Sequence, residues 1–130
     1  MRIYLETTLY NHYFDVERES HLATVKLFQG IKAGDYEAFT SVYVLRELAN
    51  APEEKRVKMF SLVDEFGIVV FGPDSFAEQL ANEYVTQGII PAKYWTDGLH
   101  IAIAAVNNLD MIISMNFQHI VKRKTKIMTK

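Results

Sequence analysis

Short apolar segments of strand character alternate with longer segments of helical period along this chain, and this alternation restricts its fold more than any other feature. The expected strands are residues 2–5, 36–40, 68–71 and 111–115. Strands that alternate with helices form parallel sheets covered on both faces, because each crossover between parallel strands needs a long connection. The sequence therefore predicts a three-layer α/β/α domain with a central parallel sheet of four to five strands.

Residue types that begin or end helices stand at the borders of the helical segments. Gly34 is expected to end one helix, Ser41 to cap the next, and Thr96 to cap the helix that contains DGLHIAIAAVNN. That last segment is apolar almost all round, so we expect its helix to be central. Residues 68–71, between two glycines, are expected to form a fully buried strand.

The size and composition of the chain indicate one globular domain. The chain has 130 residues, of which 49% are hydrophobic and 23% are charged, so we expect a single domain over residues 1–130. The absence of cysteine excludes a disulfide scaffold, a thiolate zinc site and a cysteine nucleophile, and is compatible with a reducing cytoplasm. No segment reaches the roughly 18 apolar residues of a membrane span. We therefore expect a cytoplasmic protein without a membrane anchor.

The charges are distributed unevenly. The net charge is −2, but five of the 14 basic residues lie in the tail 122–130, and all 16 acidic residues precede it. Such a tail is either a phosphate-binding arm or a solvated terminus, and the sequence leaves both interpretations open. The acidic body argues against nucleic acid as a partner, unless clustered carboxylates hold divalent metal ions that reverse the local field.

Four polar residues are expected near the carboxyl ends of the strands, where ligands bind in open parallel sheets. Glu6 and Asn116 follow the first and the last strand, Asp97 opens the apolar helix, and Glu47 lies among apolar residues after the second strand. Each has an ordinary explanation by itself, such as an ion pair, a solvated helix position or a helix end. Clustered carboxylates, however, repel one another unless cations compensate them, and Mg²⁺ or Mn²⁺ prefers oxygen ligands.

Four segments carry a resemblance to a known family. IYLETT, SVYVLREL, DGLHIAIA and IISMNFQHI resemble the PIN-domain ribonucleases, and in particular the VapC-like toxins of bacterial and archaeal toxin–antitoxin operons. The resemblance extends over about residues 1–121. The combination of DGLHIAIA with a later apolar strand that ends in SMNF is its most specific part.

The resemblance implies a PIN-like domain and a metal-dependent endoribonuclease that hydrolyses RNA as the toxin of a toxin–antitoxin pair. The four acidic positions of the family fall on Glu6, Glu47, Asp97 and Asn116, which would be the catalytic residues and the ligands of Mg²⁺ or Mn²⁺. Glu6 is longer than the usual aspartate, and Asn116 is neutral, although an asparagine form resembles a known subgroup. A cognate antitoxin and a homodimer are the expected protein partners. A catalytically degenerate PIN-like module that binds RNA or protein is the alternative.

Residues beside these four have two interpretations each. A hydroxyl of Thr7 or Thr8 would contact a metal-bound water or a phosphate, or would cap the next helix. His100 is expected to be a packed or hydrogen-bonded histidine rather than a catalytic one. Asn11 is a candidate for the rim of the site, and Arg46, with the basic tail, for the RNA backbone.

Overall fold

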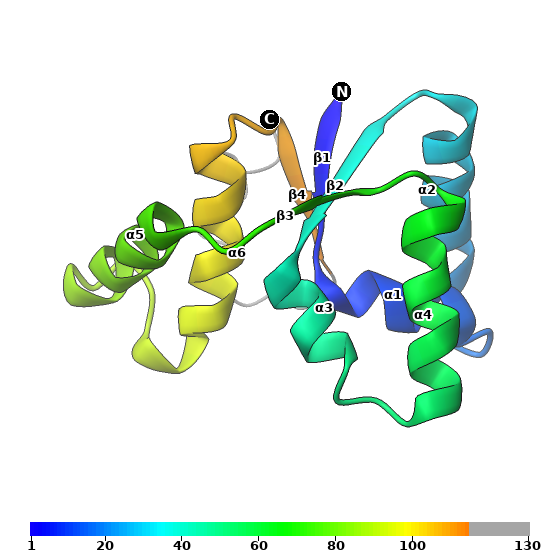
Figure 1. Cartoon of the computed structure of the whole chain (residues 1–130), viewed down its shortest axis with the longest axis horizontal. Coiled ribbons are helices and arrows are strands. Elements are labelled where there is room, and N and C mark those ends of the chain that lie inside the picture. The colour runs from blue at the N-terminus through cyan, green and yellow to red at the C-terminus, as the bar shows by residue number, and fades with distance from the viewer. Residues whose placement is uncertain (115–130) are drawn as a thin grey trace.

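The computed structural model describes residues 1–114, and a parallel sheet of four strands lies at its centre (Figure 1). In spatial order the strands are β3 (Val69–Phe71), β2 (Glu37–Ser41), β1 (Arg2–Leu5) and β4 (Met111–Ile113). Each neighbouring pair is parallel, and the register aligns Tyr4 of β1 with Phe39 of β2 and Ile112 of β4. The predicted parallel sheet is confirmed.

Helices cover both faces of this sheet. They are α1 (Thr7–Phe14), α2 (His21–Ala33), α3 (Val42–Leu48), α4 (Glu53–Glu65), α5 (Ser75–Thr86) and α6 (Trp95–Val106), with a 3₁₀ turn at Ala92–Tyr94. In Figure 1, α1, α2 and α4 lie on one side of the sheet, while α6 lies on the other side with α5 packed against its outer surface. The predicted three-layer α/β/α order is thereby confirmed.

Strand β1 and helix α6 form the centre of the molecule. Ile3, Tyr4 and Leu5 are fully buried, because β1 has a strand on each side and helices over both faces. Helix α6 is buried along most of its length, as its apolar sequence predicts. None of the helices within residues 1–114 is both long enough and apolar enough to cross a membrane.

The predicted helix borders at Gly34 and Ser41 are confirmed by the cap geometry. Gly34 ends α2 in the left-handed conformation, with φ of 88°, which glycine adopts without a steric penalty. Ser41 caps α3 by accepting a hydrogen bond from the Val44 N–H at 3.4 Å. Asp74 caps α5 through the Ala77 N–H at 3.0 Å.

Two predictions about these elements are wrong. Residues 68–71 do not form a fully buried strand: β3 lies at the edge of the sheet, and Val69 and Val70 are 50% and 37% exposed. An apolar run of β-branched residues is equally compatible with an edge strand, so the order of strands decides the burial. Thr96 does not cap α6, because the preceding 3₁₀ turn continues directly into a helix that begins at Trp95.

The structure also contains a helix that the sequence analysis did not assign. Helix α1 follows β1 directly, and Glu6 is its N-cap residue. Glutamate is not among the preferred N-cap residues, and the helix has eight residues, so neither its start nor its period gave a strong signal.

Candidate functional site

Glu6 lies between β1 and α1, directly after the carboxyl end of the central strand. Its side chain is buried, with 2% of the residue exposed. Oε1 accepts three hydrogen bonds, from the Thr8 N–H at 3.1 Å, from the Thr8 hydroxyl at 2.6 Å and from the Ser114 hydroxyl at 2.6 Å. Within residues 1–114, Oε2 accepts none. One carboxylate oxygen is thus anchored, and no residue of the described part of the chain occupies the other.

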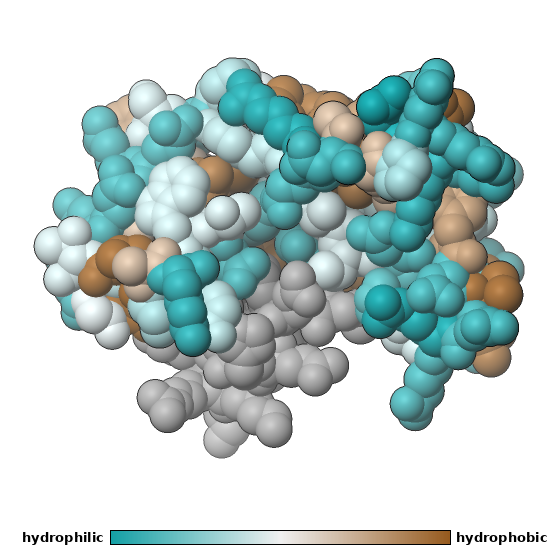
Figure 2. All heavy atoms as spheres, turned by 90° about the horizontal axis from the view of Figure 1, so that it is seen from below, coloured by the Kyte–Doolittle hydropathy of each residue, from teal (hydrophilic) through white to brown (hydrophobic). Residues whose placement is uncertain are grey.

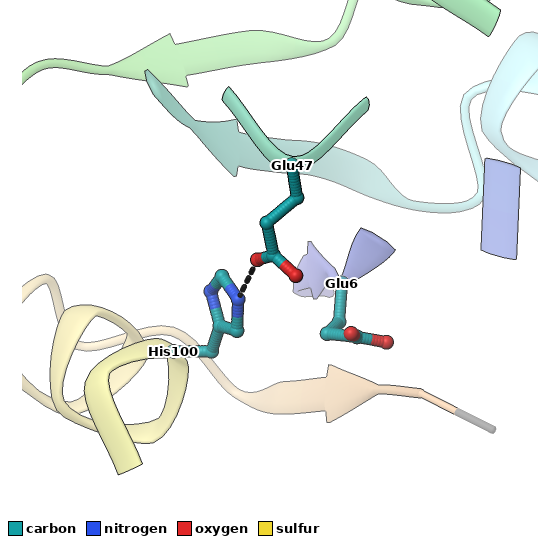
Figure 3. Close-up of side chains that lie close together, drawn as sticks. All are labelled: Glu6, Glu47 and His100. Carbon is teal, nitrogen blue, oxygen red and sulfur yellow. Dashed lines mark hydrogen bonds and ion pairs between the residues drawn. The ribbon is translucent and has the colours of Figure 1, made fainter. Parts of the chain in front are cut away.

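Glu47 approaches the same region from α3. Its side chain is 37% exposed, and its Oε1 lies 2.9 Å from Nε2 of His100. This contact joins two residues that are 53 positions apart in the sequence. The second oxygen of Glu47 is turned toward Glu6 (Figure 3).

His100 holds Glu47 through a buried chain of hydrogen bonds. Its side chain is 1% exposed, and Nδ1 lies 2.7 Å from the Tyr4 hydroxyl, which lies 2.7 Å from the Ser41 hydroxyl. Because the Glu47 carboxylate only accepts, Nε2 carries the ring hydrogen, and in the neutral ring Nδ1 accepts from Tyr4. Tyr4 then accepts from Ser41, whose oxygen accepts from the Val44 N–H. With the hydrogens placed in this way, each hydrogen bond between Val44 and Glu47 has one donor and one acceptor.

Tyr4, which lies between Ser41 and His100 in this series of hydrogen bonds, keeps its proton. Burial raises the pKa of Tyr4 well above its ordinary value, and the negative charges of Glu47 and Glu6 add smaller contributions in the same direction. Tyr4 therefore remains a hydrogen-bond donor to His100 at physiological pH. Both ring nitrogens of His100 are then occupied, so this residue positions a carboxylate rather than offering a free nitrogen to a ligand.

Together these residues form an acidic cluster at the end of the sheet. One ligand atom each from Glu6, Glu47 and His100 lies within 4.8 Å of the others. In the described part of the chain, neither carboxylate has a lysine or arginine nitrogen within 4.0 Å. Two carboxylates thus converge without a cationic side chain from residues 1–114, an arrangement that a hard divalent cation would stabilise.

The four residues predicted for the site are placed differently. Glu6 and Glu47 come together, as the sequence analysis expects. Asp97 lies partly buried in the first turn of α6, one turn before His100, and does not belong to the group within 4.8 Å. Asn116 and the basic tail lie outside the described residues, so their predicted roles stay predictions.

The neighbouring residues resolve some of the alternatives. The Thr8 hydroxyl and N–H both bind Glu6, so Thr8 anchors the site residue itself. The Thr7 hydroxyl is buried and has no hydrogen-bond partner among the described residues. His100 is a hydrogen-bonded core histidine, as predicted, although its link to Glu47 was not foreseen. Ser114 was also missed, and its place two residues before Asn116 was the available signal.

Comparisons with known proteins give a likeness in structure but not in sequence. No protein-family model matches the chain, and no curated protein matches it. The crystal structure of VapC20 from Mycobacterium tuberculosis, described as a sarcin-ricin loop cleaving toxin, superposes with a TM-score of 0.71 at 13% identity, over 89% of this chain and 91% of that chain.

A second solved structure gives the same result. The structure of VapBC2 from Rickettsia felis, bound to a DNA fragment from their promoter, matches with a TM-score of 0.64 at 16% identity, over 95% of this chain and 92% of that chain. Both likenesses extend over most of the sheet and its helices. The chain has the PIN-domain fold of these VapC structures.

Proposed function

We propose that this protein is a metal-dependent endoribonuclease that acts as the toxin of a toxin–antitoxin pair. The observation that carries the proposal is the convergence of Glu6 and Glu47 at the carboxyl end of the central strand, where no lysine or arginine of residues 1–114 pairs with them. The fold adds support, because the similar VapC20 is described as a toxin that cleaves the sarcin-ricin loop.

The donor set fits a divalent metal ion with a preference for oxygen. Glu6 and Glu47 each keep one carboxylate oxygen that has no hydrogen-bond partner within residues 1–114. Mg²⁺ and Mn²⁺ bind through carboxylates and retain several waters, so two protein ligands are compatible with such an ion. We assign Glu6 and Glu47 as its ligands, with Asp97 and Asn116 completing the set directly or through water.

A bound divalent ion would supply an activated water and stabilise the charge that develops on the phosphate in the transition state. The residues of the chain provide the geometry for this chemistry. Thr8 and Ser114 fix the Glu6 carboxylate, and the His100 chain fixes that of Glu47. Asp97 adds a negative charge in the first turn of α6, at the positive end of the helix dipole.

The proposed partners follow from the same fold. VapBC2 from Rickettsia felis was crystallised on promoter DNA, and we propose that this chain also pairs with a cognate antitoxin that blocks its acidic site. RNA is the proposed substrate, the homodimer is the proposed assembly, and the cytoplasm is the proposed compartment.

The experiment is cleavage of a structured RNA by wild-type protein and by Asp97→Asn, with and without Mn²⁺. Asparagine keeps the shape of the side chain, so the expected loss is one negative charge at the metal. Such a loss removes several kcal/mol of transition-state stabilisation, or more than about 100-fold in rate. Circular dichroism and RNA binding, measured on the same preparations, are expected to be unchanged.

Two outcomes would contradict the proposal. Undiminished cleavage by folded Asp97→Asn would contradict the proposed set of metal ligands, because Asp97 is assigned to that set. A wild-type protein that binds RNA, but neither cleaves it nor gains thermal stability from millimolar Mn²⁺, would be the catalytically degenerate binding module instead.

A further inference from the structure

A polar hollow of about 310 Å³ lies beside the acidic site, on the surface formed by α1, the turn after it and the first turn of α4. Its lining is formed by Thr8, Asn11, His12, Asp15, Arg18 and Lys55. Thr8 belongs to both places, because its hydroxyl donates to Glu6 while the residue lines the hollow. A ligand in this hollow would therefore be a direct neighbour of the acidic site.

The hollow offers hydrogen-bond donors that no described residue uses. Lys55 has no carboxylate oxygen within 4.0 Å in residues 1–114. Arg18 binds Asp15 through Nε at 2.8 Å, which leaves its two terminal amino groups without a partner among the described residues. The side-chain amide of Asn11 has none in that part of the chain either. These donors suit a ligand whose polar atoms are hydrogen-bond acceptors.

The charge of the hollow suits a monoanion. Asp15 is already paired with Arg18, and no carboxylate of residues 1–114 pairs with the positive charge of Lys55. Burial, followed by the nearby Arg18, lowers the pKa of His12, so His12 is neutral at physiological pH. One excess positive charge is notable in residues 1–121, which carry nine basic and sixteen acidic residues. A phosphodiester group carries one negative charge and presents oxygen acceptors.

Figure 2 views the molecule from the end of the sheet at which β1 ends, and shows hydrophilic side chains over much of the side that carries α1, α2 and α4. The lining offers no apolar floor for a hydrophobic ligand, and its one carboxylate is occupied, so it does not suit a metal ion. We propose that this hollow binds a phosphodiester of the RNA strand next to the bond that is hydrolysed, through Lys55, Arg18 and Asn11.

This inference rests on the proposed function for the identity of the strand, and it sets the path of that strand. The RNA backbone would run from the Glu6–Glu47 cluster over Thr8 and along the exposed side of α1 toward the start of α4. Phosphate contacts of this kind position the nucleic acid and carry no sequence information.

Lys55 has a matched control on the same helix. Lys58 is also an exposed lysine of α4, but it pairs with Glu54 at 3.9 Å and does not line the hollow. Lys55→Gln and Lys58→Gln remove the same charge, and glutamine is an equally good helix former. Any difference in RNA binding between the two variants therefore results from the position of the lysine and not from the change in net charge.

The experiment measures binding without cleavage. The affinity for a fluorescein-labelled single-stranded RNA is followed by anisotropy in EDTA at several salt concentrations. We expect Lys55→Gln to weaken binding and to lower the slope of log K against log salt by about 0.7, the value for one lost phosphate contact on a single strand. Arg18→Gln is expected to lower the slope similarly, and Lys58→Gln to leave it unchanged.

Equal slopes for Lys55→Gln and Lys58→Gln, or a Lys55→Gln slope equal to wild type, would overturn the assignment of this hollow. Equally strong competition by oligoglutamate and by unlabelled RNA would also overturn it, because the hollow would then bind anions in general. The two proposals can fail separately. A slope difference without any RNA cleavage would keep the subsite and remove the nuclease, and cleavage without a slope difference would do the reverse.

Discussion

Glu6 and Glu47 meet at one site, but two different kinds of structure hold them. Glu6 is held mainly by local contacts: it follows the central strand directly, caps the next helix and binds the Thr8 hydroxyl two residues later, while the Ser114 hydroxyl adds one contact from the end of β4. Glu47 is held from a distance, by a histidine on α6 that is itself fixed by a tyrosine on β1. Glu6 is buried, whereas the side chain of Glu47 is 37% exposed. Local and tertiary anchoring should therefore respond to mutation in different ways.

The largest expected effect comes from removing the tertiary anchor. His100→Ala leaves a cavity in the core and takes the acceptor from the buried Tyr4 hydroxyl. We expect the free energy of unfolding to fall by about 2–4 kcal/mol, measured by urea denaturation. His21→Ala is the control, because His21 is less buried and its side chain makes one hydrogen bond within residues 1–114, to the His12 carbonyl. Similar losses for the two variants would contradict the assigned role of His100.

The same substitution separates positioning from packing. If His100 orients Glu47, His100→Ala should weaken Mn²⁺ binding by about 10- to 100-fold, the usual cost of losing a residue that orients a metal ligand. His100→Gln keeps an N–H donor for Glu47 and should restore most of the affinity without restoring the stability. Isothermal titration with Mn²⁺ measures the affinity. Equal affinity in all three proteins would mean that Glu47 needs no orientation by residue 100.

Sequence reasoning located these residues to different degrees. The end of a central strand is predictable from an apolar run and its place in the chain. Glu6 was therefore predicted correctly at the carboxyl ends of the strands. The contact between Glu47 and His100 joins residues 53 positions apart, and no local pattern encodes it. The edge position of β3 was missed for a related reason. Its apolar, mostly β-branched residues are compatible with a central strand as well as with an edge strand.

The local anchor should show a smaller effect. Thr8→Val has nearly the same shape but removes the hydroxyl that donates to Glu6 at 2.6 Å, while the Thr8 N–H bond remains. We expect a loss of about 1.5–3 kcal/mol in the free energy of unfolding, the range for hydrogen bonds to charged groups. Thr86→Val is the matched control, since it removes an exposed hydroxyl that bonds the Asn82 carbonyl within α5.

For Thr86→Val the expected change is within about 0.5 kcal/mol. A Thr8→Val variant as stable as this control would show that Ser114 and the Thr8 N–H anchor Glu6 sufficiently by themselves. The anchoring of Glu6 would then depend less on any single hydrogen bond than the anchoring of Glu47 does.

The smallest effect is expected where the local anchor is shortened rather than removed. Glu6→Asp keeps the charge, and aspartate is a preferred N-cap residue, so the bond to the Thr8 N–H should be retained. The carboxylate would retract by one methylene, away from the Ser114 hydroxyl and away from Glu47. Because Mg²⁺ keeps several waters, a water can take up this change in distance. We therefore expect cleavage within about tenfold of wild type, a difference of roughly 1.4 kcal/mol in the barrier. The measurement is single-turnover cleavage with Mn²⁺, with circular dichroism as the control for folding. A far larger loss in a folded protein would show that Glu6 reaches its partners through the full length of its side chain, and the two carboxylates would then be equally dependent on geometry.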